Sequence, residues 1–215
     1  MIADTMLRIA VWAVPVLMAI VFHEVAHGWV ANRLGDSTAA RMGRLTLNPI
    51  AHIDLFGTII LPLLLIITRA PFLFGYAKPV PVNFYNLNRP KRDMVWVALA
   101  GPATNILLAA ASILIVRLLS SLGLAGDGFL APLRYMAEAS VVINIVLAVF
   151  NAFPIPPLDG GRVMVGLLPE PYSSMLARVE PYGFLIILIL LMTDALGVLI
   201  GPPIRFLLGV VDGLF

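Results

Sequence analysis

The chain has 215 residues, of which 60% are hydrophobic and 12% are charged, and its mean hydropathy is +0.99. So few charges cannot cover a soluble surface, so we expect an integral membrane protein embedded in the lipid bilayer. The net charge is only +2 and the basic residues are scattered, which argues against nucleic-acid binding. Since the chain has 0 cysteines, a disulfide or thiolate site is excluded, and any metal must bind His, Asp or Glu.

Apolar stretches recur along the chain, and those of about 20 residues are long enough to cross a membrane. They cover residues 9–31, 55–74, 94–119, 128–153, 183–200 and, more briefly, 204–215. We predict an all-α, polytopic helical bundle of about five to six membrane segments, forming a single domain over residues 1–215 with its core at about 9–165. The first stretch continues through a charged motif without a small-residue cleavage pattern, so we expect a retained span and not a signal peptide.

Two basic clusters predict the orientation of the bundle. One follows the first apolar stretch and the other precedes residues 94–119: Arg33, Arg41 and Arg44, then Arg89, Lys91 and Arg92. Both should be cytoplasmic, with the amino terminus outside. An even number of crossings then separates them, which favours a re-entrant hairpin over residues 55–88.

Within that hairpin, the segment Lys78-Pro79-Val80-Pro81-Val82 is typical of an edge strand or of a rigid loop. Its alternate prolines leave one edge without N–H donors, whereas the other edge can pair. As a strand, it could hold an unwound substrate by strand addition. We therefore expect a small re-entrant β element.

The motif His23-Glu24-Val25-Ala26-His27 lies inside an apolar run, Val11 to Val30, that contains no other charge. Residues four apart share a helix face, so His23 and His27 can bind one Zn²⁺ with Glu24 beside them. Glu24 is then the candidate general base for amide hydrolysis by an activated water. Ionisable groups within a membrane span are costly and rarely persist without a function.

A third metal ligand must come from elsewhere in the chain. The acidic candidates inside or beside apolar stretches are Asp54, Glu138, Asp159 and Asp194. We favour Asp159, because three prolines precede it and two glycines follow it in the segment Asn151-Ala152-Phe153-Pro154-Ile155-Pro156-Pro157-Leu158-Asp159-Gly160-Gly161. Prolines end the helix and force extended backbone, which is tolerated at membrane depth where it lines a wet cavity. The span that precedes Asp159 should deliver it to the same side as the histidines.

Four other residues in the apolar stretches, two of them asparagines, could contribute to helix packing or to catalysis. Gly101 and Pro102 are best explained by close helix packing. Asn105 offers an amide either for an interhelical hydrogen bond or for the oxyanion that develops during hydrolysis, and for Asn151 we favour the second role. We expect His52 to be hydrogen-bonded beside a turn and not to bind the metal.

Taken together, these motifs make the chain resemble the site-2 protease family of intramembrane zinc metalloproteases, peptidase family M50, from His23 to about Arg162. The residues that carry the resemblance are His23, Glu24 and His27, the Gly-Pro-x-x-Asn pattern that starts at Gly101, and the Asn-x-x-Pro-x-Pro-x-Leu-Asp-Gly pattern from Asn151 to Asp159 and Gly160. The resemblance implies one Zn²⁺ per chain, held by His23, His27 and Asp159.

The resemblance also implies what the protein acts on. Members cleave membrane-spanning protein substrates on the cytosolic side of the bilayer, in regulated intramembrane proteolysis. We expect a minimal form without a PDZ or CBS domain, in a bacterial or archaeal cell membrane, multi-pass, with its active site towards the cytosol.

Competing classes of function fit less well. The chain has neither the Gly-x-Ser-x-Gly pattern of a serine hydrolase nor the Gly-x-Gly-Asp pattern of an aspartyl intramembrane protease. A better alternative is a non-enzymatic membrane protein that binds or transports a metal ion. Glu24 discriminates between them, because hydrolysis requires a base beside the metal whereas transport requires more ionisable groups along a path. A catalytically dead scaffold has no support, since the full catalytic set is present.

Overall fold

The structure is a computed structural model that describes residues 2–70, 72, 75–124, 126 and 128–213; side chains 2–6, 8 and 212 are not described. Every regular element in these ranges is helical. The α-helices are α1 (Ile2–Arg33), α2 (Thr38–Arg41), α3 (Leu61–Ile67), α4 (Pro90–Ser121), α5 (Ala131–Asn151), α6 (Asp159–Leu167), α7 (Tyr172–Ala177), α8 (Gly183–Met192) and α9 (Ala195–Asp212). Short 3-10 turns cover Pro49–His52, Phe84–Asn86 and Glu180–Tyr182, and a π-helical segment covers Leu55–Ile60.

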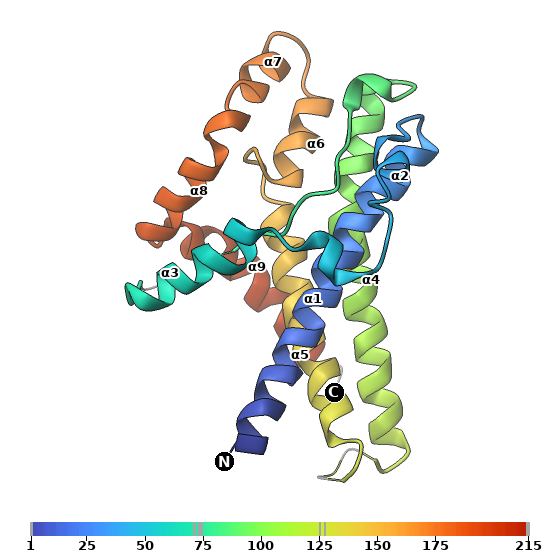
Figure 1. The fold of residues 1–215 in the computed structure, drawn as a ribbon, viewed down its shortest axis with the longest axis vertical. Helices are drawn as coiled ribbons and strands as arrows, with labels where there is room; N and C mark the ends of the chain where they lie inside the picture. The colour runs from blue at the N-terminus through green and yellow to red at the C-terminus, as the bar shows by residue number, and fades with distance from the viewer. Residues whose placement is uncertain (1, 71, 73–74, 125, 127, 214–215) are drawn as a thin grey trace.

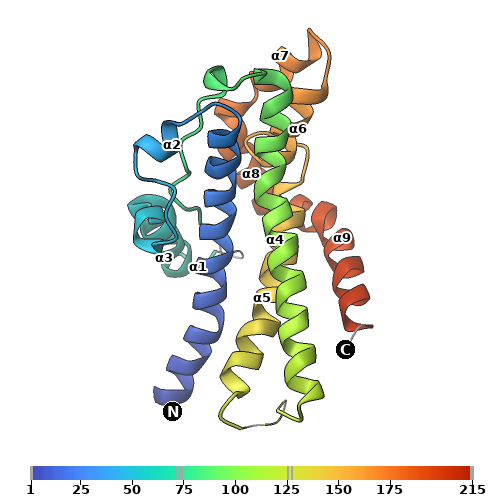
Figure 2. The ribbon, with the colours of Figure 1, turned by 90° about the vertical axis from the view of Figure 1, so that its right-hand side faces the viewer.

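Three long helices form the centre of the molecule. Helices α1 and α5 run in the same direction, and α4 runs against both of them (Figure 1). The view at 90° shows the same three-helix centre, with α3 and α9 lying on opposite sides of it (Figure 2). Because α1 and α5 are parallel, their carboxyl-terminal halves reach the same end of the bundle, which brings the chain after Asn151 close to the histidine motif.

The membrane character of the chain is confirmed by its helices. Within the described ranges, four segments are long and apolar enough to cross a bilayer: Ile9–Arg33, Pro90–Ser121, Ala131–Asn151 and Tyr172–Met192. The expected five to six membrane segments are reached only if one or both of the shorter apolar helices, Leu55–Ile67 and Ala195–Val211, also enter the bilayer. Large apolar side chains such as Leu107 and Leu114 point outward on α4, as lipid contact requires.

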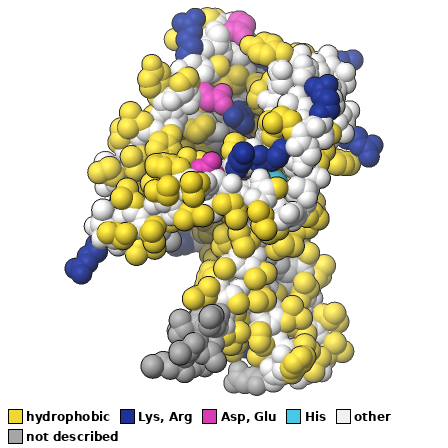
Figure 3. Space-filling view, viewed as in Figure 1, with side chains coloured by type: hydrophobic (Ala, Val, Ile, Leu, Met, Phe, Trp, Pro, Cys, Tyr) yellow, Lys and Arg dark blue, Asp and Glu magenta, His cyan; other side chains and the backbone are white. Residues whose placement is uncertain are grey.

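The polar residues concentrate at one end. In Figure 3, hydrophobic side chains cover most of the visible face, and most charged side chains gather in its upper half. The Asn88 N–H donates to the Leu34 carbonyl at 2.8 Å, so the chain leaves α1 and enters α4 at the same place. The two basic clusters therefore lie at the same end of the bundle, as the sequence predicted.

Residues 55–83 leave the bundle and return to it. The π-helical segment and α3 carry the chain outward (Figure 1), and it comes back as an extended segment, residues 75–83. Two backbone hydrogen bonds close this hairpin, from the Tyr76 N–H to the Gly57 carbonyl at 3.0 Å and from the Lys78 N–H to the His52 carbonyl at 2.9 Å. The described residues contain no strand, so the structure does not show the expected β element.

Candidate metal centre

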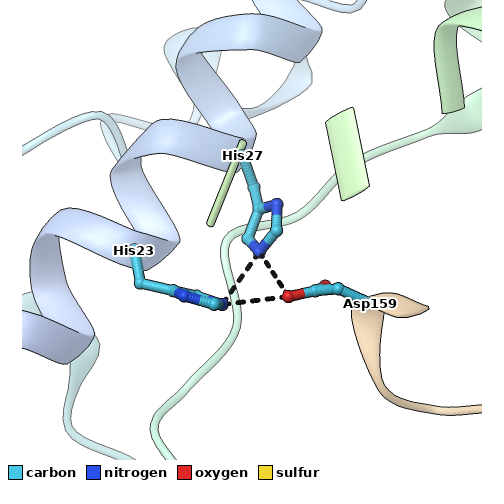
Figure 4. Close-up of side chains that lie close together, drawn as sticks. All are labelled: His23, His27 and Asp159. Carbon is cyan, nitrogen blue, oxygen red and sulfur yellow. Dashed lines mark hydrogen bonds and ion pairs between the residues drawn. The ribbon is translucent and has the colours of Figure 1, made fainter. Parts of the chain in front are cut away.

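His23, His27 and Asp159 meet at one point between α1 and the start of α6 (Figure 4). The two histidine Nε2 atoms lie 3.0 Å apart, and the Asp159 Oδ2 lies 3.1 Å from the first and 3.3 Å from the second. Their side chains are only 8%, 12% and 9% exposed. The structure thus brings together the three predicted metal ligands.

The hydrogen bonds of the two Nδ1 atoms determine which nitrogen of each histidine carries the proton. The His27 Nδ1 lies 2.7 Å from the Val97 carbonyl oxygen, which can only accept, so this nitrogen carries the proton. The His23 Nδ1 lies 2.5 Å from the Asn105 Oδ1, which also accepts. In the neutral rings each Nε2 then has a lone pair and no proton, and both lone pairs face the Asp159 carboxylate.

Three acceptor atoms this close repel one another unless a cation lies between them. The Asp159 Oδ2 is buried and has no hydrogen-bond donor, as expected of a metal-ligand atom. Ligands about 2.0–2.1 Å from a tetrahedral Zn²⁺ lie about 3.3–3.4 Å apart, close to the distances found here. The two imidazoles and the carboxylate are also ligand types that zinc accepts, so the group is compatible with zinc.

Gly101 lies where α4 packs closely on α1, as expected of a small residue between helices. A Cβ on Gly101 would lie 2.4 Å from the His27 Nε2 and 2.5 Å from the His23 Cε1. Only glycine leaves room for both rings against α4. Pro102 stands inside the helix, where it removes one backbone N–H donor. Gly101 is therefore part of the wall of the metal centre.

Asp159 is placed by the segment around it. It opens α6 directly after the proline-rich turn, and the first turn of α6 packs on the backbone of that turn. A Cβ on Gly160 would lie 2.1 Å from the Ala152 carbonyl oxygen, and one on Gly161 would lie 2.2 Å from the Pro156 nitrogen. The two glycines allow this close approach, and the approach delivers the carboxylate to the histidines.

Glu24 lies beside the metal ligands and faces the returning segment. Its Oε2 accepts a hydrogen bond of 2.7 Å from the Val80 backbone N–H. Glu24 and the three ligands line a cavity of about 480 Å³, together with Gly75, Ala77, Pro79 and Asn151. The candidate base, the metal ligands and the extended segment therefore line one cavity.

The two asparagines differ in their positions. Asn105 is fully buried and uses its amide on His23, on the Ala19 carbonyl and on Asn144. The interhelical interpretation of Asn105 therefore describes its contacts, and its amide is not free to bind an oxyanion. Asn151 lines the cavity, and its Nδ2 donates to the Leu147 carbonyl at 3.0 Å.

The other acidic candidates and His52 lie outside the metal group. Asp54 accepts from the Gly57 N–H, Glu138 pairs with Arg134 at 3.6 Å, and Asp194 separates α8 from α9. The His52 Nε2 donates to the Thr46 carbonyl at 2.8 Å, as expected for a structural histidine.

Comparison with known proteins agrees with this site. The model of peptidase family M50 matches residues 11–140 and 124–193. The chain is 37% identical to the "Putative zinc metalloprotease YwhC" of Bacillus subtilis over 181 residues, which are 84% of this chain and 79% of that protein. It is 33% identical to the "Putative zinc metalloprotease Rip2" of Mycolicibacterium smegmatis over 185 residues, 84% of this chain and 66% of that protein.

A more distant relative is the "Zinc metalloprotease MJ0392" of Methanocaldococcus jannaschii, which is 23% identical over 167 residues, 76% of this chain and 37% of that protein. No solved structure matches the chain. The family model matches most of the chain, including both histidines and Asp159. The alignments with the Bacillus and Mycolicibacterium relatives also cover most of the chain. The chain therefore belongs to peptidase family M50.

Proposed function

We propose that this protein is an intramembrane zinc metalloprotease that hydrolyses peptide bonds of membrane-spanning proteins near the cytosolic side of the bilayer. The observation that carries the proposal is the acceptor-only group His23, His27 and Asp159, which shares a cavity with Glu24 among apolar helices. Relatives that cover most of the chain are named zinc metalloproteases, which supports the same chemistry.

His23, His27 and Asp159 would hold the zinc, and Glu24 and Asn151 would act on the reactants. Zinc bound there would supply a Lewis acid that polarises the scissile carbonyl and lowers the pKa of water to about 7. Glu24 would take the proton from the attacking water and later give it to the leaving amine. The Asn151 amide lines the same cavity, from which it would donate a hydrogen bond to the oxyanion.

Residues 75–83 would hold the unwound substrate. The N–H groups of Tyr76, Lys78 and Val80 all point into the protein, an alternation typical of extended backbone. Tyr76, Ala77 and Pro79 line the cavity, as does Glu24, which accepts from the Val80 N–H. Ala77 keeps its N–H there, so a substrate strand can pair with it and complete the expected β element.

Transport of a metal ion has less support. A transport path would continue from the metal group along α4 and α5, away from the basic clusters. The buried polar side chains that the structure describes there are Asn105, Ser112 and Asn144. None of these three can carry a charge. A carrier needs ionisable groups along its path, and these three side chains supply none.

The test is cleavage of a single-span reporter in liposomes by the wild type and by Glu24→Gln, with bound zinc measured in both. We expect the variant to keep zinc and to lose cleavage, because the amide cannot take up the proton. Zinc bound by both proteins without cleavage of several reporters would favour the binding or transport function instead.

The orientation can be tested separately, because the chain has 0 cysteines. Met42 and Leu122 are exposed at opposite ends of the bundle, so Met42→Cys and Leu122→Cys introduce single thiols there. In intact cells, a membrane-impermeant maleimide should label Cys introduced at position 122 and spare that at position 42. The reverse pattern would place the metal centre near the outer side.

A further inference from the structure

A chain of hydrogen-bonded polar side chains runs through the apolar core and ends on a predicted metal ligand. The antiparallel helices α4 and α5 supply its members, which are Asn105 and Ser112 from α4 and Ser140 and Asn144 from α5. Asn105 and Asn144 are 0% and 1% exposed. Burying two amides among apolar side chains costs several kcal/mol unless they are hydrogen-bonded, so the pair is there for more than packing.

Each bond in this chain has a defined direction. The Asn144 Nδ2 donates to the Ser140 carbonyl oxygen at 2.8 Å, and since a carbonyl can only accept, this contact fixes which way the amide faces. The Asn144 Oδ1 must then point to Asn105, from whose Nδ2 it accepts a bond of 2.8 Å. The Asn105 Oδ1 is thereby turned towards the His23 Nδ1.

The last step of this sequence acts on the metal centre. An acceptor at the His23 Nδ1 holds the proton on that nitrogen and leaves the Nε2 lone pair facing His27 and Asp159. If the Asn105 amide turned around, its NH₂ group would face Nδ1 and favour the opposite tautomer, whose protonated Nε2 cannot bind a metal. A second restraint, from the Asn105 Nδ2 to the Ala19 carbonyl, is longer at 3.3 Å.

We infer that Asn144 is a positioning residue for the metal centre, which selects the metal-binding tautomer of His23 by orienting the Asn105 amide. Asn144 does not line the cavity around the metal ligands, and its amide bonds to Asn105 and Ser140. The inference rests on the proposed zinc site and adds a residue that no catalytic motif of the chain contains.

The test compares three variants of the full-length protein in detergent. Asn144→Leu keeps the size of the side chain but removes the acceptor for Asn105. Asn144→Asp is the conservative variant, because a protonated, buried carboxyl group can donate to the Ser140 carbonyl and accept from Asn105. Ser112→Ala is the matched control. The Ser112 hydroxyl donates to the Ser140 Oγ at 2.8 Å, and the Asn144 Nδ2 also contacts this Oγ at 3.1 Å, but the direction of the Asn144 amide is fixed by its closer bond to the Ser140 carbonyl, which Ser112→Ala keeps.

Two quantities are measured: zinc affinity by competition with a chelator, and the protonated nitrogen of His23 in the metal-free protein by ¹⁵N NMR. The chain has only 3 histidines, so the signals can be assigned with His27→Ala and His52→Ala. We expect Asn144→Leu to lower zinc affinity about tenfold, at the weak end of the 10–100-fold typical for groups that support a metal ligand, and to mix the two His23 tautomers. Asn144→Asp and Ser112→Ala should keep the wild-type values.

The outcomes separate this inference from the proposed function. Wild-type zinc affinity and a single His23 tautomer in Asn144→Leu would overturn the inference and leave the zinc site standing. Equal losses in Asn144→Leu and Ser112→Ala would also overturn it, because they would show a general packing effect. If the wild type itself bound no zinc, both the proposed function and the inference would fail.

Discussion

Gly101→Ala tests the metal centre with a single methyl group. The added Cβ would lie 2.4 Å from the His27 Nε2 and 2.6 Å from the His23 Nε2, within helix α4, whose backbone has little freedom to move. An ordinary contact requires at least about 3.4 Å, so one or both rings must move by about 1 Å. A metal site tolerates about 0.2 Å in its ligand distances, and a misplacement of 1 Å commonly costs about 10²-fold in function.

We therefore expect Gly101→Ala to lower zinc affinity by about 10²-fold or more and to abolish reporter cleavage, while the protein still folds. The assay is zinc content after dialysis against a chelator series, with thermal unfolding in detergent recorded on the same samples. Gly209→Ala in α9 is the matched control, because nothing lies within 4 Å of its added Cβ. Stoichiometric zinc at wild-type affinity in Gly101→Ala would refute the reasoning that Gly101 makes room for the histidines.

Three further predictions concern the elements around the metal centre. Val80→Pro removes the N–H that donates to Glu24 and should lower kcat about tenfold with zinc retained. Val80→Ala keeps this N–H and should leave kcat unchanged. If Val80→Pro cleaved the reporter as fast as the wild type, this bond would not orient the base. Gly160→Ala, with its Cβ 2.1 Å from the Ala152 carbonyl oxygen, should displace Asp159 and lower zinc content, which elemental analysis measures. Asp36→Asn should destabilise the end of the bundle where Asp36 binds Asn83 and Asn86, by about 1–3 kcal/mol at neutral pH, measured as a lower Tm.

The Asp36 prediction also has a pH dependence. Burial acts to raise the pKa of Asp36, but hydrogen bonds from Thr38, Asn86 and Asn83 outweigh burial and hold the pKa below its usual value. A carboxyl group whose pKa is lowered by folding stabilises the protein above its unfolded pKa of about 3.9, and this stabilisation is lost as the pH falls through the folded pKa. The Tm difference between wild type and Asp36→Asn should therefore shrink below about pH 4. A constant difference would contradict this assignment.

Local patterns determined much of this protein. The apolar stretches predicted membrane helices, because a spanning segment must satisfy its backbone internally and cover itself with apolar side chains. The four-residue spacing of His23 and His27 predicted two ligands on one helix face, since helix geometry is local. Asp159 could be chosen among four acidic candidates because its prolines and glycines describe an unusual backbone, and the structure brings it to the histidines.

Other features arose only from the packing of distant segments. The hydrogen bond from Val80 to Glu24 joins residues 56 positions apart, and that from Asn105 to Asn144 joins residues 39 apart. No periodicity reports such pairs, because they depend on the depth and rotation at which each helix meets its neighbours. For the same reason Gly101 suggested ordinary helix packing, although the rings it accommodates belong to another helix.

The extended segment 75–83 shows most clearly what local sequence patterns could not predict. Its prolines predicted an edge strand or a rigid loop. A strand requires a partner, and within the described chain this segment lines the cavity. Sequence alone therefore determined the helices, the ligand types and the extended backbone, all of which follow from neighbouring residues. Tertiary structure decided which atoms meet, because a metal site, a tautomer and a substrate edge each depend on contacts between elements that are remote along the chain.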